Sequence, residues 1–148
     1  MRLVLDSDPK IHTIRRYGQG EIHVGERVLR GPCIVSATRI VADWAARSAA
    51  TLDEAQLAPL LELRPAVILL GLRGGDAPPP RALVVQLQRR GVGIETMLLG
   101  AACRTYNVMV HEGRAVVAGL FPEQGTPKEG TGGERSPTKQ SPEADGIG

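Results

Sequence analysis

The first third of the chain alternates between apolar and polar residues in short runs, as β-strands do. Residues 12–17 and 21–24 form two such runs, and the glycine-rich stretch 18–20 separates them as a turn. Apolar runs at residues 33–35 and 40–44 predict two more strands. This part of the chain is therefore expected to consist of short β elements.

A capping-box pattern at residues 51–54 predicts that a helix starts there. Leu57, Leu60 and Leu61 follow at helical spacing and are expected to point inward. Pro59 has no backbone N–H, so it predicts either a kink or a later start with Pro59 in the first turn.

Strands and helices alternate in the second half of the chain. Residues 67–70 are all apolar, which is typical of a strand buried on both faces of a sheet. A helix is expected from Pro80 to Gly91, because proline fits the first helical turn and glycine fits the position after the last one. The other predicted elements are a loop at 71–79, a strand at 93–96, a helix at 101–111 and a strand at 115–121. This order predicts an α/β sheet.

The composition changes this picture little. The chain has 148 residues, 42% apolar and only 3% aromatic, so we expect one domain whose core rests on Val, Ile, Leu and Ala. No apolar run approaches the roughly 18 residues of a membrane-spanning helix, and the N-terminus has no apolar stretch long enough for a signal peptide. We therefore expect a cytoplasmic protein with no membrane span.

Charge and composition divide the chain into two parts. The net charge is +2 and the arginines are spread along the chain, so no nucleic-acid binding is expected. After Pro122 the chain is rich in Gly, Pro, Ser and charged residues, and its only apolar aliphatic residues are Ala144 and Ile147. The sequence therefore predicts a globular domain at residues 1–122 and a disordered tail at residues 123–148.

The two cysteines, Cys33 and Cys103, are expected to be free thiols because the chain carries no export signal. No Cys or His pair has metal-ligand spacing, so neither a metal nor a cofactor is predicted. Cys103 precedes Arg104, and a nearby cation lowers a thiol pKa, so an activated thiolate is one hypothesis. A small buried residue in an Ala-rich helix is the favoured alternative.

The most specific stretch of the sequence lies between residues 93 and 114. It contains Glu95-Thr96-Met97, then Ala101-Ala102-Cys103-Arg104-Thr105-Tyr106-Asn107, then Glu112-Gly113-Arg114, and further matching positions are Ile14, Tyr17, Gly18, Gly20, Ile22, Trp44 and residues 68–71. Over roughly residues 10–122 the chain resembles a small-domain family of largely unknown function. That family includes the mitochondrial complex I (NADH:ubiquinone oxidoreductase) assembly factor three and uncharacterised bacterial and archaeal proteins.

The resemblance implies a three-layer α/β domain with a central mixed sheet of about five strands, helices packed on it and an added N-terminal β element. It implies no established reaction, because the best-described members are non-catalytic helpers in building complex I. The chain departs from the family at residues 71–75, where the family usually has Gly-Thr-Gly. It departs again at Leu98-Leu99, where the family often has Asp-Thr.

The loop after the buried strand is one candidate site. The backbone amides of Gly71, Gly74 and Gly75 are suited to an anion-binding nest to which Arg73 adds charge, although a tight turn that needs glycine explains the loop equally well. The loop continues to Asp76 and is neither a P-loop nor a dinucleotide fingerprint.

The predicted helix at 101–111 supplies the other candidates. Tyr106 and Asn107 either line a pocket or bond the backbone at the end of the helix. Arg104 is expected to form a structural ion pair with Glu95 or Glu112, which are close in sequence.

Two functional hypotheses remain open from the sequence. The first is a binding protein that assists assembly of a larger complex without catalysis, with an unidentified protein partner and an open alternative of a homodimer. The second is a small-molecule or anion binder, or an enzyme, that uses the loop 71–76 with Arg104, Tyr106 and Asn107. No catalytic residue is assigned, so enzymatic activity is left undecided and disfavoured.

Overall fold

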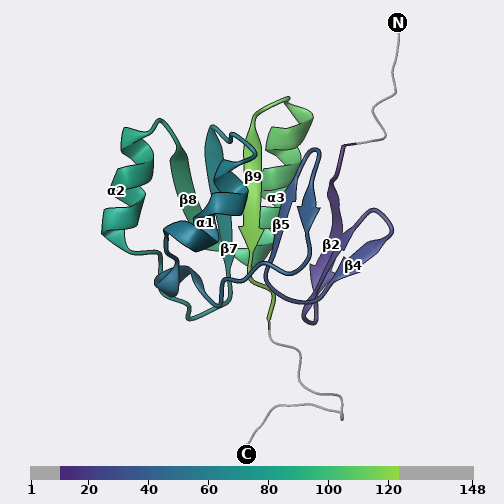
Figure 1. The fold of residues 1–148 in the computed structure, drawn as a ribbon. Coiled ribbons are helices and arrows are strands. Elements are labelled where there is room, and N and C mark those ends of the chain that lie inside the picture. The colour runs from purple at the N-terminus through teal and green to yellow at the C-terminus, as the bar shows by residue number, and fades with distance from the viewer. Residues whose placement is uncertain (1–10, 124–148) are drawn as a thin grey trace, which may run out of the picture.

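The computed structural model describes residues 11–123, which fold into three layers (Figure 1). A five-stranded mixed sheet forms the middle layer and carries helices on both faces, while a separate three-stranded antiparallel sheet packs beside it. The helices are α1 (Glu54–Leu61), α2 (Arg81–Arg89), α3 (Leu99–His111) and the short 3-10 helix η1 (Ala49–Thr51). The α/β class and the added N-terminal β element are thus confirmed.

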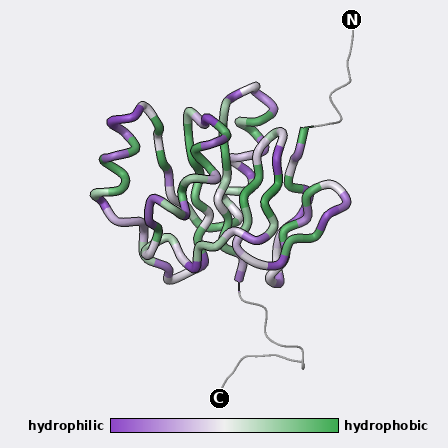
Figure 2. The backbone as a smooth tube through the Cα atoms, viewed as in Figure 1, coloured by the Kyte–Doolittle hydropathy of each residue, from purple (hydrophilic) through white to green (hydrophobic). Residues whose placement is uncertain are grey.

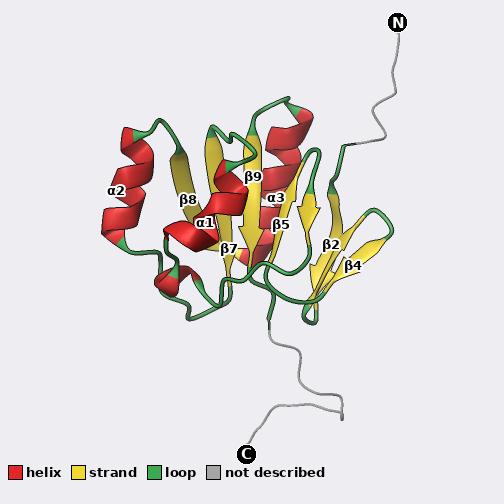
Figure 3. Ribbon diagram, viewed as in Figure 1, coloured by secondary structure: helices red, strands yellow, loops and turns green. Residues whose placement is uncertain are grey.

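The strands of the central sheet are yellow in Figure 3, and the most buried of them lie in the middle of the sheet. Its strands are β5 (Cys33–Ser36), β6 (Ile40–Val41), β7 (Val67–Leu72), β8 (Gly93–Leu98) and β9 (Val116–Leu120), in the order β6-β5-β9-β7-β8. β7 runs parallel to β8 and β9, whereas β5 is antiparallel to β9 and to β6. Every residue of β9 is buried, which explains the continuous apolar run in its sequence.

Two apolar clusters lie on the two faces of this sheet. Leu69 of β7 and Ala118 of β9 pack toward α3, while Ile68 and Leu70 pack toward α1 and α2. Successive residues of a strand point to opposite faces, so one apolar strand supplies both clusters. In Figure 2, hydrophobic residues, drawn in green, are concentrated in the centre of the molecule.

The start of α1 differs from the prediction. Asp53 caps the helix, because its carboxylate accepts a hydrogen bond from the Gln56 backbone N–H at 2.9 Å, and the Gln56 side chain accepts one from the Asp53 N–H at 3.2 Å. The capping box therefore begins two residues later than Thr51, whose segment forms η1. Pro59 lies inside α1, so the alternative of a late start, with Pro59 in the first turn, is wrong.

Three predicted boundaries in the second half are wrong by two residues. β7 continues to Leu72 and β8 to Leu98, so Gly71 belongs to a strand and not to the loop. α3 follows β8 directly and starts at Leu99 instead of residue 101. Gly91 follows α2 with a φ of +81°, the left-handed conformation that glycine was predicted to supply.

The smaller sheet consists of β2 (Ile14–Gly18), β3 (Glu21–Val24) and β4 (Arg27–Leu29). β4 was not predicted, because three residues are too few to show a clear alternation. Ile22, Val24 and Leu29 are buried beneath this sheet in the cluster that also contains α3 residues. The sheet is therefore packed onto the α3 side of the molecule.

The strand predicted at residues 40–44 is shorter than expected. β6 ends at Val41, and Trp44 lies beyond it with 5% of its surface exposed. The indole Nε1–H of Trp44 donates to the Gln56 carbonyl at 2.8 Å, which ties this segment to α1. Aromatic packing against Phe121, with ring centroids 5.2 Å apart, completes the contact.

The predicted disordered tail, residues 123–148, lies outside the described residues except for Glu123. Within residues 11–123, no helix has the length and apolar character needed to cross a membrane.

Candidate functional site

The loop proposed as an anion nest is closed by one of its own side chains. The Asp76 carboxylate accepts hydrogen bonds from Arg73, at 3.2 Å from the backbone N–H and 2.9 Å from Nε. The same guanidinium donates from Nη2 to the Arg47 carbonyl at 2.8 Å and lies 5.7 Å from the centre of the Phe121 ring. The loop thus already contains a carboxylate bonded to its cation.

The glycines of this segment have different roles. Gly71 lies inside β7, where a Cβ would come within 2.9 Å of the Ala102 Cβ and 3.3 Å of the Leu99 Cα. Glycine there lets α3 approach the sheet closely. Gly74 and Gly75 lie in the exposed turn, where an added Cβ would meet no atom within 4 Å.

Tyr106 and Asn107 hold the smaller sheet against α3. The Tyr106 hydroxyl donates to the His12 carbonyl at 2.7 Å, and burial of this ring raises the pKa of its hydroxyl. The Asn107 amide donates to the Ile14 carbonyl at 2.8 Å and accepts from the Ile14 N–H at 2.9 Å. Both side chains bond backbone groups, as the second alternative expected, but these groups belong to His12 and Ile14 and not to the end of the helix.

Arg104 does not form the predicted ion pair. Its guanidinium donates from Nη1 to the Tyr17 hydroxyl at 2.8 Å, and the ion pairs found within residues 11–123 join other residues. Glu95 lies on the outermost strand, β8, with its side chain exposed. The prediction was wrong because closeness in sequence did not become closeness in space for these side chains.

One exposed stripe of α3 nevertheless gathers side chains suited to binding. Gly100, Arg104, Val108 and His111 recur at helical spacing, and Tyr17 lies over Gly100, whose Cβ would come within 2.8 Å of the tyrosine oxygen. Tyr17 is 41% exposed and Val108 is 57% exposed. We call these five residues the α3 surface.

The thiols are not reactive centres. Burial raises the pKa of both Cys33 and Cys103 to about 12, and the neighbouring Cys103 adds to the rise at Cys33. For Cys103 the Arg104 guanidinium acts in the opposite direction but is outweighed by burial. The activated-thiolate hypothesis is therefore wrong, and both residues are buried free thiols, as the sequence predicted.

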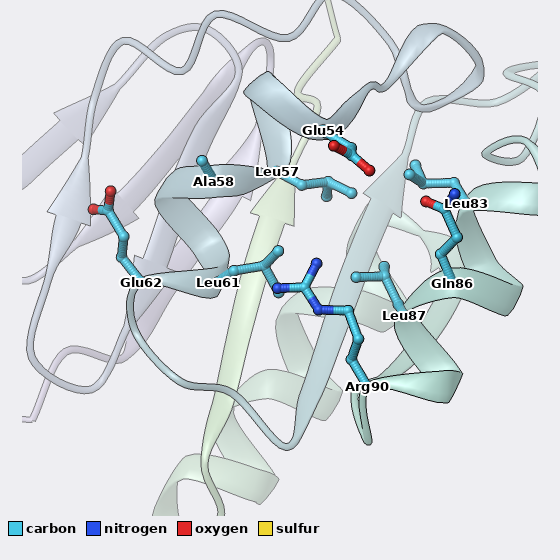
Figure 4. Close-up of a pocket in the computed structure, with 9 residues that line it drawn as sticks. All are labelled: Glu54, Leu57, Ala58, Leu61, Glu62, Leu83, Gln86, Leu87 and Arg90. Atoms are coloured by element: carbon cyan, nitrogen blue, oxygen red, sulfur yellow. The ribbon is translucent and has the colours of Figure 1, made fainter.

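A second feature is a groove between α1 and α2 (Figure 4), with a volume of about 370 Å³. Leucines from both helices form its floor and sides. Glu54 lies at one end beside Leu83, and Arg90 reaches into the other end toward Leu61 (Figure 4). The lining residues are Glu54, Leu57, Ala58, Leu61, Glu62, Leu83, Gln86, Leu87 and Arg90.

The residues that the sequence grouped into one site make different contacts in the structure. The loop 71–76 lies at the end of β7, Arg104 is exposed on α3, and Tyr106 and Asn107 are used in packing. Sequence reasoning missed Tyr17 and the groove. The inward-facing leucines of the two helices were a usable signal for the groove, but nothing in the sequence showed that these helices lie side by side.

Among residues 11–123, no cluster of three or more His, Cys, Asp or Glu side chains is arranged to hold a metal ion.

Comparison with known proteins places this geometry in a family. A family model described as a protein of unknown function (DUF498/DUF598) matches residues 14–121. An uncharacterized protein of Rhodobacter capsulatus is 32% identical over 109 residues, covering 74% of this chain and 83% of that protein. The human NADH dehydrogenase (ubiquinone) 1 alpha subcomplex assembly factor 3 is 31% identical over 103 residues, covering 68% of this chain and 55% of the human protein.

The fold is also similar to a solved structure. The NMR structure of a Xanthomonas campestris protein matches with a TM-score of 0.70 and 30% sequence identity, covering 80% of this chain and 92% of that one. This chain is similar both to an NADH dehydrogenase subcomplex assembly factor and to an uncharacterised bacterial protein, so the resemblance inferred from the sequence is confirmed. The chain belongs to the family of proteins of unknown function DUF498/DUF598.

Proposed function

We propose that this domain is a non-catalytic protein-binding module that helps to assemble a larger complex, and that the α3 surface contacts the partner. The observation that carries this proposal is the exposed arrangement of Tyr17, Arg104 and Val108 on one stripe. Tyrosine and arginine are the residue types that contribute most binding energy at protein interfaces. The hydrogen bond between them orients Arg104 before any partner arrives, which reduces the entropy lost on binding.

The relatives support the general role. The human relative is named as an assembly factor of an NADH dehydrogenase subcomplex, and we carry over to this chain only assistance in assembly through protein contacts. The partner is unidentified, and we place the activity in the cytoplasm, as the sequence predicts.

The ligand-binding alternative has less support. An anion entering the loop would have to displace Asp76 from Arg73. Tyr106 and Asn107 are unavailable to a ligand while they bond the backbone of His12 and Ile14. These contacts leave the loop without the convergent free polar groups that binding sites for small molecules use.

A comparison of two valine variants tests the proposal. The tagged full chain is expressed in its native cell, captured, and its copurifying proteins are quantified by mass spectrometry. Val108→Asp should abolish the specific partner, whereas Val28→Asp, which changes another exposed valine on β4, should retain it.

Arg104→Glu is a second test on the same surface and should also abolish capture. If the Val108→Asp and Arg104→Glu variants capture the same proteins as the unmodified chain, the α3 surface is not the contact. If neither the unmodified chain nor any variant captures a specific protein, the assembly role itself is wrong.

A further inference from the structure

The outer edge of β8 carries an inference that is independent of the α3 surface. Each of the two sheets ends in an edge strand on either side, and the other edges among residues 11–123 are protected. β6 has only two residues and β4 only three, while β2 has an irregular register and is bonded at Ile14 by Asn107 of α3. β8 is a regular strand of six residues without proline or lysine. It therefore lacks the devices that usually protect a sheet edge from pairing with another strand.

Alternate backbone groups of β8 point away from the sheet. The Gly93 N–H donates to the Ala66 carbonyl at 2.9 Å, which is toward β7. Successive residues of a strand direct their backbone groups to opposite sides, so the N–H and C=O of Ile94 and Thr96 point outward. The Leu98 N–H also points outward, whereas its C=O belongs to the N-cap of α3. Thr96 is exposed and Leu98 is 62% exposed, so this row of donors and acceptors is accessible.

A second copy of this chain does not fit the edge of β8. α2 lies beside β8 at this end of the molecule (Figure 1) and contacts it. Two β8 strands paired around a two-fold axis would be about 4.8 Å apart, and the two α2 helices on the same face would be brought to about the same separation. Packed helices need about 8–10 Å between their axes. A single extended strand meets no such obstacle.

We propose that β8 binds an extended segment of another protein, which adds a strand to the central sheet and places a basic residue opposite Glu95. Glu95 is exposed and belongs to none of the ion pairs formed within residues 11–123. Opposite charges directly across two strands stabilise their pairing, so Glu95 favours lysine or arginine at that position. In strand addition the backbone hydrogen bonds supply affinity, and the alternating side chains supply specificity.

The two faces of β8 favour different residues in the added strand. Ile94 packs against the cluster under α1 and α2, and Leu98 lies on the same face because side chains alternate along a strand. Met97 packs against the cluster under α3, so Glu95 lies on that face. The added strand therefore covers Ile94 and Leu98 with apolar side chains and meets Glu95 with a base on the other face. The expected segment alternates apolar residues and has a lysine or arginine directly beside one of them.

Phage-displayed random heptapeptides, selected on the immobilised full chain, test this recognition. The enriched peptides should show the alternating apolar residues with an adjacent lysine or arginine. Selection on Glu95→Lys should enrich an acidic residue in place of the basic one, because the charge that it faces is reversed. Glu26→Lys makes the same change of charge in the exposed turn between β3 and β4, so selection on this control should still enrich the basic residue.

Thr96→Pro tests the backbone hydrogen bonds. Proline removes an N–H that points away from β7, so the ladder between β7 and β8 stays intact, and circular dichroism confirms that the variant is folded. A synthetic copy of the most enriched peptide should bind this variant with a Kd about tenfold or more above that of the unmodified chain. The same peptide should slow hydrogen exchange at the Thr96 amide of the unmodified chain.

The inference is overturned if no peptide is enriched, if Glu95→Lys selects the same basic peptides, or if Thr96→Pro binds the peptide as tightly as the unmodified chain. Slow exchange at the Thr96 amide without peptide would also overturn it. At every concentration it would assign the edge to another segment of this chain, and only at high concentration to a second copy. None of these readouts involves Val108, so strand addition at β8 and the assembly role of the α3 surface can fail separately.

Discussion

At the scale of single residues, Gly71 marks the closest approach between α3 and the sheet. Its Cβ would lie within 2.9 Å of the Ala102 Cβ and 3.3 Å of a backbone atom of Leu99, neither of which can move freely. Gly71→Ala should therefore lower the free energy of unfolding by about 1–3 kcal/mol, the usual cost of overpacking a core. Chemical denaturation measures this change.

Gly74→Ala is the matched control for Gly71→Ala. Its added Cβ would meet no atom within 4 Å, so its free energy of unfolding should stay within about 0.5 kcal/mol of the unmodified value. Equal stability of the two variants would show that α3 does not depend on glycine at position 71.

Arg104 is the second residue whose role can be tested by itself. Its bond to Tyr17 is exposed, and exposed polar contacts contribute little because water competes for both groups. Arg104→Ala should lower the free energy of unfolding by less than about 1 kcal/mol, measured by chemical denaturation. A loss above about 3 kcal/mol would instead indicate a buried ion pair.

At the scale of elements, Asn107 joins α3 to β2. Its side chain bonds both the N–H and the C=O of Ile14, as the backbone of a neighbouring strand would do. Asn107→Leu would leave the N–H and C=O of Ile14 without these partners, so the free energy of unfolding should fall by about 2 kcal/mol. Hydrogen exchange should also quicken at the Ile14 amide. The Ile22 amide on β3 is the internal control.

If exchange at Ile14 stays slow in the Asn107→Leu variant, the smaller sheet is held by its apolar contacts alone. Those contacts include Ile22 and Val24, which are buried in the same cluster as Tyr106 of α3. The hydrogen bonds of Asn107 would then only orient β2.

At the scale of the whole molecule, the buried thiols make the free energy of unfolding fall as the pH rises through the alkaline range. The pKa of each thiol is about 12 in the fold, whereas an unburied thiol has a pKa of 9.0. As the pH rises, the thiols of the unfolded chain lose their protons before those of the folded chain. The part of the unfolding free energy that depends on protonated thiols is therefore fully present below pH 9 and is lost as the pH rises toward 12. Urea denaturation at pH 8 and at a pH of about 10.5 measures the fall.

Replacement of both cysteines provides the control for this pH dependence. Cys33→Ala/Cys103→Ala should be less stable at pH 8, because it leaves cavities, but should lose less stability between the two pH values. An identical pH dependence in both proteins would assign the effect to other groups, such as the buried Tyr106 hydroxyl.

The boundary of the domain is also a property of the whole chain. Residues 124–148 are rich in glycine and charged residues and contain few apolar ones. A chain that ends at Glu123 should therefore keep its thermal midpoint within about 2 °C. A fall of more than about 5 °C would mean that residues 124–148 contribute about 1 kcal/mol or more to stability.

Local pattern was enough to predict most elements of the fold. The apolar run at residues 67–70, the helix between Pro80 and Gly91, and the alternation at residues 21–24 each depend on neighbours along the chain. Boundaries were less predictable, because whether a strand continues to Leu72 or Leu98 depends on the strand beside it. The strand β4 was missed because its three residues are too few to show an alternation.

The sequence by itself determined the fold class and the family, since these follow from periodicity and from characteristic residues. Only the tertiary structure decided the roles of polar side chains. A guanidinium can donate to any acceptor within its reach, and the fold determines which acceptors are near. Arg104 therefore donates to Tyr17, and Arg73 donates to Asp76. The groove likewise exists only because the sheet places α1 beside α2, a relation across the fold that spacing along the chain does not encode.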